Sequence, residues 1–65
     1  MRDISRTELT ETIDEYILNE KYRAIIKRRL LDGITYDGLA AEFCMSPRQI
    51  KRIVYKAEEV IFRHL

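Results

Sequence analysis

The sequence has few of the residues that build disulfide frameworks and metal centres. Its 65 residues include one cysteine, one histidine, two glycines and one proline. The single cysteine, Cys44, cannot form an internal disulfide, which fits a reducing cytosol. Cys44 and His64 supply too few ligands for a metal site. We therefore expect Cys44 to fill a buried turn and His64 to lie on the surface or at a helix end.

Long apolar runs and the usual parts of an enzyme are also missing. The first residues lack the apolar core of a signal peptide, and no segment approaches the length needed to cross a bilayer. The sequence offers no glycine-rich phosphate loop and no nucleophile beside a base. We therefore expect a cytoplasmic protein with no membrane contact, no cofactor and no enzymatic activity.

The charges are distributed unevenly along the chain. Residues 1–20 hold two arginines against six carboxylates, whereas residues 21–65 hold ten lysines and arginines against five carboxylates. A basic body behind an acidic start is compatible with a polyanionic partner such as nucleic acid. Ordinary solvated helix faces would produce the same pattern, so charge alone leaves both interpretations open.

A helix-start signal occurs three times, at Ser5, Thr35 and Ser46. Each is a good N-cap, because its side-chain oxygen can accept a hydrogen bond from the first helical turn. Glu8 and Gln49 follow Ser5 and Ser46 by three residues, which predicts two capping boxes, and Pro47 suits the first helical position. Apolar pairs flank each cap and predict hydrophobic staples: Ile4 with Leu9, Ile34 with Leu39, and Met45 with Ile50.

The apolar residues recur at helical spacing, and no stretch alternates with the period of a strand. Three stripes carry this pattern: Leu9, Ile13, Tyr16 and Ile17; Tyr22, Ile25, Ile26, Arg29 and Leu30; and Ile50, Ile53, Val54, Ala57 and Ile61. Asn19 is a candidate cap for the second helix, and Gly33 is placed to end it. We predict an all-α, compact four-helix domain spanning residues 1–65, with helices at 5–18, 20–32, 36–43 and 47–63.

Only residues 44–46 join the third and fourth predicted helices. A turn this short makes two helices cross steeply, and a small residue such as Ala40 is needed at the contact. This arrangement predicts a helix-turn-helix over about residues 36–55. Its core would consist of Leu39, Ala40, Phe43, Met45, Ile50 and Ile53.

The face of the fourth helix opposite Ile50 is predicted to read DNA in the major groove. The candidate base contacts are Arg48, Gln49, Lys51, Arg52 and Tyr55. The candidate phosphate contacts are Thr35, Tyr36, Ser46, Lys27, Arg28 and Lys56, with Arg23 and Arg63 as further candidates. Gly38, inside the third helix, either lets the backbone approach DNA closely or is simply tolerated there.

Residues 33–43 and 45–52 resemble region 4 of bacterial sigma factors and related small regulators of phages and mobile elements. The similarity covers about residues 19–65. It implies that the third and fourth helices bind promoter-type DNA, with Arg48, Lys51 and Arg52 where the family contacts the −35 element or an operator. Cys44 departs from the pattern, because the family usually has glycine in this turn. The polymerase-binding and −10-reading regions are missing from these 65 residues, so the resemblance implies a small transcriptional regulator.

Sequence-specific binding of double-stranded DNA is therefore the function that we expect. The alternative is an interaction module that binds RNA polymerase or another regulator with little DNA contact, through Phe62 and Leu65 or the acidic first helix. Phe62 would form an interface with Val60 and Leu65, or the first helix would fold back and cover it. Such an interface would give a homodimer through the C-terminal helix.

Overall fold

The computed structural model describes residues 5–65, and this part of the chain forms four helices and no strand. They are α1 (Arg6–Tyr16), α2 (Glu20–Leu30), α3 (Tyr36–Phe43) and α4 (Pro47–Arg63). The all-α prediction is confirmed. The bounds of α3 and α4 are those predicted, whereas α1 and α2 each end two residues sooner. Ile4, one partner of the first predicted staple, lies outside the described residues.

Side-chain caps start all four helices where the sequence places them. Ser5, Asn19, Thr35 and Ser46 each accept a hydrogen bond from the backbone amide three residues later. The capping box at Ser46 is complete, because the Gln49 side chain accepts from the Ser46 amide at 3.1 Å. These caps satisfy amides that the helix itself leaves unpaired.

Gly38 stands three residues after the Thr35 cap, where a capping box would place glutamate or glutamine. A Cβ atom at this position would lie 3.0 Å from Ile34 Cγ2 and 3.1 Å from the capping oxygen of Thr35. The glycine therefore leaves room for both the cap and the packing of Ile34 beside it.

Two short links explain the early ends of α1 and α2. Ile17 adopts an extended backbone after α1, and the chain then reverses before the Asn19 cap. After α2, residues 31 and 32 form a turn and Gly33 takes a positive φ of 70°. Gly33 is thus the reversal point that the sequence indicates, but the helix proper ends at Leu30.

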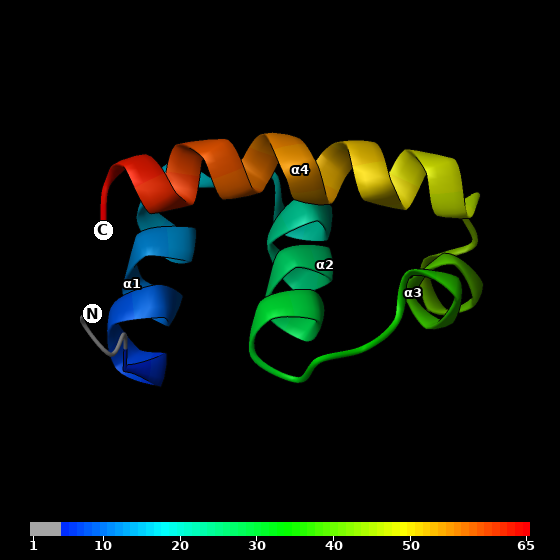
Figure 1. Ribbon diagram of the computed structural model, residues 1–65, viewed down its shortest axis with the longest axis horizontal. Coiled ribbons are helices and arrows are strands. Elements are labelled where there is room, and N and C mark those ends of the chain that lie inside the picture. The colour runs from blue at the N-terminus through cyan, green and yellow to red at the C-terminus, as the bar shows by residue number, and fades with distance from the viewer. Residues whose placement is uncertain (1–4) are drawn as a thin grey trace.

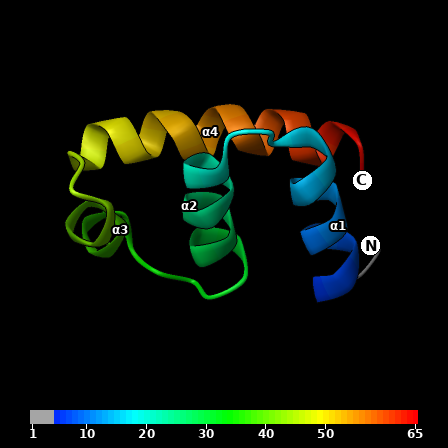
Figure 2. The ribbon, with the colours of Figure 1, turned by 180° about the vertical axis from the view of Figure 1, so that it is seen from behind.

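The helix α4 lies across one end of α1 and α2, which stand side by side beneath it (Figures 1 and 2). Figure 1 shows α3 nearly end-on while α4 lies in the plane of the view, so the two helices cross steeply. The core between the helices consists of Ile13, Ile25, Ile26, Leu39, Ala40, Ile50, Val54, Ala57 and Ile61. Its residues come from every helix, so α4 is held along its length by the other three.

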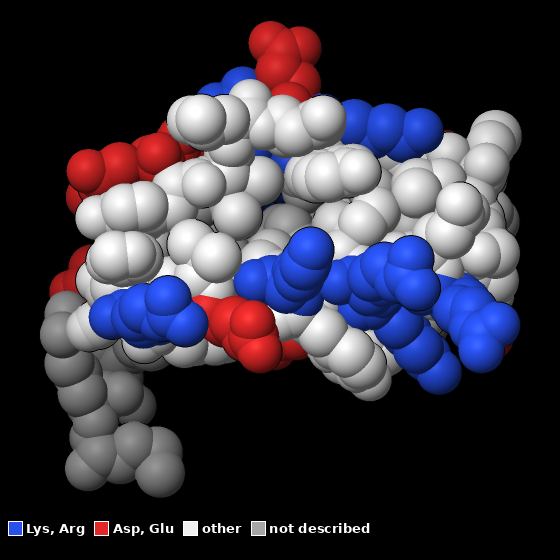
Figure 3. All heavy atoms as spheres, turned by 90° about the horizontal axis from the view of Figure 1, so that it is seen from above, with Lys and Arg blue, Asp and Glu red and all other residues white. Residues whose placement is uncertain are grey.

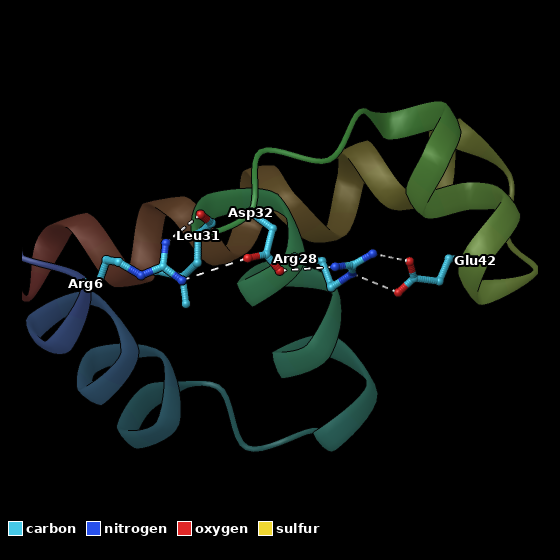
Figure 4. Close-up of polar contacts among 5 residues, drawn as sticks. All are labelled: Arg6, Arg28, Leu31, Asp32 and Glu42. Carbon is cyan, nitrogen blue, oxygen red and sulfur yellow. Dashed lines mark hydrogen bonds and ion pairs between the residues drawn. The ribbon is translucent and has the colours of Figure 1, made fainter.

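An ionic network fixes α3 to α2 and α2 to the start of α1 (Figure 4). Arg28 donates to both carboxylate oxygens of Glu42 at 2.7 and 3.0 Å and to Asp32 at 3.2 Å. Arg6 lies 3.9 Å from Asp32 and donates to the carbonyl of Leu31 at 2.9 Å. The hydrogen bonds from Arg28 to Glu42 and then to Asp32 raise the pKa of its guanidinium. Arg28 is therefore engaged by protein carboxylates on both sides.

Candidate nucleic-acid interface

The junction of α3 and α4 is packed around buried side chains. Leu39 and Ile50 are fully buried and Ala40 is 8% exposed, so the small residue does lie at the contact. Phe43, Met45 and Ile53 are partly buried against the same core. The Met45 amide donates to the carbonyl of Ala40 at 2.9 Å, which closes the turn back onto α3. The N-terminal half of α4 therefore has a fixed direction relative to the rest of the molecule.

Cys44 is exposed, so the expectation that it fills a buried turn is wrong. It adopts the left-handed conformation, with φ 56° and ψ 45°, and caps α3. Its backbone makes the reversal between the helices while its side chain points to solvent. Most residues avoid this conformation because Cβ crowds the neighbouring carbonyl, so the turn is made at some conformational cost.

Basic side chains form a row along α4 in the view onto this helix, with an acidic group between them (Figure 3). The exposed cations of α4 are Arg48, Lys51, Arg52, Lys56 and Arg63. None of them forms an ion pair with a carboxylate among residues 5–65, and Arg48 and Arg52 make no other polar contact in that range. These charges are therefore available to a ligand.

Most cations outside α4 are engaged within the protein, although Lys21 on α2 is exposed and has no ion pair in residues 5–65. Lys27 lies 2.7 Å from Asp14, and Arg23 lies 4.0 Å from Glu20. Arg28 and Arg6 belong to the ionic network. The predicted phosphate contacts of Lys27 and Arg28 would require these cations to leave their carboxylates.

On the side of the interface next to α3, three side chains contact the ring of Tyr36. Arg29 lies over the ring at 4.3 Å from its centre and Lys51 at 5.6 Å, while Tyr55 meets it edge-on at 6.2 Å. Arg29 also donates to the carbonyl of Ile34 at 3.0 Å. These contacts restrain Lys51 and Tyr55, since an aromatic ring attracts a cation over its face and packs edge-on with another ring. Sequence reasoning did not find this role of Arg29, because its only signal was helical spacing.

The side chain of Gln49 is directed to its own helix end. Its Oε1 accepts from the Ser46 amide at 3.1 Å and lies 3.3 Å from the Ser46 hydroxyl. A bidentate contact with adenine needs that oxygen free. The structure therefore supports the capping role predicted for Gln49 and leaves its predicted base contact without a free acceptor.

The cap oxygens of Thr35 and Ser46 likewise bind backbone amides of their helices. Among the six predicted phosphate contacts, Lys56 alone is a cation that the described part of the chain leaves unpaired. It lies on α4 one turn after Arg52.

The apolar residues in the last turn of α4 and just after it do not form one patch. Phe62 is 48% exposed, Leu65 is partly buried against the core, and Val60 lines a groove on another side of the helix. Residues two apart on a helix point in different directions, which separates Val60 from Phe62. His64 caps the end of α4 and stacks on Tyr16 with ring centres 3.9 Å apart, so it lies at a helix end as expected.

Comparisons with family models, with curated proteins and with solved structures find no match to this chain. Within residues 5–65, no three His, Cys, Asp or Glu side chains gather as metal ligands would. Over the same range, no helix combines the length and the apolar character needed to cross a bilayer. Function is therefore inferred from the geometry of α4 and of its junction with α3.

Proposed function

We propose that this protein binds duplex DNA in a sequence-selective manner by placing the N-terminal half of α4 in the major groove. The observation that carries the proposal is the division of the cations. Four of the cations of α1 and α2 form ion pairs with carboxylates, whereas none of the five exposed cations of α4 has a carboxylate partner in residues 5–65. Unpaired, exposed cations on one rigid helix suit a polyanionic ligand.

The dimensions of α4 fit the proposed binding mode. The major groove is wide enough to admit one α-helix. Arg48 and Arg52 lie one turn apart, about 6 Å along the helix axis, so both can reach base edges of neighbouring pairs. An arginine fork matches the two acceptors of guanine, which makes Arg48 and Arg52 the proposed base-reading residues.

Three further residues of α4 would position the helix. Lys51 and Lys56 flank the arginines on opposite sides and are proposed to bind phosphates at the two groove rims. Tyr55 is 56% exposed and lies beside the Tyr36 ring. In this position, Tyr55 can contact the DNA backbone. Phosphate contacts of this kind set the register without reading sequence.

The steep junction of α3 and α4 supports a helix-turn-helix interpretation of residues 36–55. The resemblance to sigma region 4 leads to the same interpretation of these helices and places Arg48, Lys51 and Arg52 at the DNA. On these grounds, we propose that the protein acts as a small transcriptional regulator.

Selection from a library of random duplexes tests the proposal. The wild-type protein is expected to enrich one sequence motif, and the Arg48→Ala/Arg52→Ala variant is expected to enrich none while keeping its helical circular dichroism. The matched control is Lys21→Ala/Arg63→Ala, which also removes two exposed cations but spares the N-terminal half of α4. The control should recover the wild-type motif. Failure of the wild-type protein to enrich any motif would overturn the proposal.

A further inference from the structure

An open groove runs beside α4 on the side facing the α1–α2 link. Its volume is about 450 Å³, within the range of roughly 300–1,000 Å³ typical of ligand sites. Its apolar lining consists of Ile17, Tyr22, Ile53, Ala57 and Val60. A smaller hollow of about 170 Å³ continues it toward the N-terminus of α4 and shares Tyr22, Arg52 and Ile53 with it. Figure 3 shows the surface hollowed beside the row of basic side chains.

The rim of the groove carries net positive charge. Arg52, Lys56 and Arg63 line it together with one carboxylate, Glu59. The three cations have no ion pair within the described chain. Tyr22 in the wall is 42% exposed, and Leu18, next to Ile17, is 82% exposed. The groove thus combines unpartnered apolar surface with an unneutralised basic edge.

We infer that this groove docks an acidic amphipathic helix of a partner protein. The apolar residues that α4 contributes, Ile53, Ala57 and Val60, follow one another at steps of four and three along the helix. A partner helix meets such a surface with apolar side chains at the same spacing. Acidic residues beside that stripe would face Arg52, Lys56 and Arg63 and replace their hydration with charge pairs.

The described chain offers no such helix of its own to a second copy. The acidic helix is α1, and its apolar face is already buried in the core, where Ile13 is fully covered. Its exposed residues are charged or polar apart from Tyr16, which is 39% exposed and stacks on His64. The occupant must therefore be a different protein segment, with apolar and acidic residues on adjoining faces.

A designed peptide of about 16 residues, long enough for four helical turns, tests the inference on the full chain without DNA. It carries leucines at the i, i+4 and i+7 spacing with glutamates on both sides. Titration into ¹⁵N-labelled protein should shift the amide signals of the groove residues saturably. Two control peptides, with lysine for glutamate or alanine for leucine, should each bind at least about tenfold more weakly.

Two variants in the last turns of α4 separate the groove from the rest of the helix. Val60→Asp places a charge in the groove wall and should abolish saturable peptide binding. Phe62→Asp makes the same kind of change on another side of α4 and should leave binding unchanged. Both variants are checked for helicity, and the control peptides test the inference on the unmodified protein.

The inference is overturned if the acidic peptide fails to saturate, if the lysine peptide binds equally well, or if the shifts lie outside the groove. Concentration-dependent dimerisation that Val60→Asp removes would also overturn it, because a second copy would then fill the groove. The titration contains no DNA, so failure here leaves the DNA-binding proposal standing, and failure of the library selection leaves this one standing.

Discussion

At the scale of single residues, Cys44 shows how a turn can be made against local preference. Its left-handed backbone is needed because three residues must reverse the chain between α3 and α4. The buried contacts on both sides, through Leu39 and Ile50, hold the turn in place. The cost of the conformation is therefore met by packing rather than by the residue at the turn.

Replacement of Cys44 by glycine should stabilise the protein. Glycine removes a backbone cost of about 1–2 kcal/mol in the left-handed region. It also lowers the stability by about 0.4–1 kcal/mol, because glycine gives the unfolded chain more conformational freedom. A net gain of up to about 1.5 kcal/mol, or a rise in Tm of several degrees, is expected in urea and thermal unfolding. Cys44→Ser keeps the Cβ atom and should give no gain. Equal effects of the two substitutions would contradict a backbone origin.

The residues also show which predictions a sequence can support. The caps at Thr35 and Ser46 depend on neighbours within three residues, and the sequence predicts both. The contacts of Arg29 with Tyr36 and of Arg28 with Glu42 depend on how two separate helices, α2 and α3, pack together. Helical spacing alone cannot show whether a cation will face a carboxylate, a ring or solvent.

At the scale of helices, some boundaries can be predicted from the sequence and others cannot. The bounds of α3 and α4 are predictable because strong signals stand at their starts and the link between them is too short to vary. The ends of α1 and α2 are not, since the chain must leave each helix early to pack Ile17 and to turn at Gly33. Steep packing of α3 on α4 follows from the short link, and the structure shows it (Figure 1).

The network around Arg28 should stabilise the docking of α3 on α2 in a salt-dependent way. Glu42→Gln removes the charge that receives two hydrogen bonds from Arg28, so Tm should fall. The loss should shrink near 1 M salt, where the Debye length is about 3 Å and exposed charges are screened. The control is Glu59→Gln on α4, a carboxylate with no ion pair in the described residues. If the two variants lower Tm equally at low salt, the network does not hold α3.

At the scale of the whole molecule, the charged side chains have two roles. Asp14 of α1 and Glu42 of α3 pair with cations of α2, whereas α4 exposes its cations on the surface. The near-zero net charge of +1 therefore conceals a basic face. Net charge cannot reveal such a face, because it depends on which pairs the fold brings together.

The proposed DNA face and the inferred groove lie on neighbouring sides of α4 and share two cations, Lys56 and Arg52. A partner helix in the groove would place acidic groups beside these cations. The two ligands are therefore expected to compete for them, which would couple protein binding to DNA binding.

The affinity for the selected duplex across a salt series, followed by fluorescence anisotropy, tests the central claim most directly. If Arg48 and Arg52 read bases, their double replacement by alanine should weaken binding at least about thirtyfold, since each good contact is worth about 1–3 kcal/mol. Discrimination against a scrambled duplex should disappear with it. The control Lys21→Ala/Arg63→Ala should keep that discrimination and lose less than about threefold in affinity, because these cations lie outside the reading face. Equal losses in the two variants would show a generic charge effect and contradict a reading helix in α4.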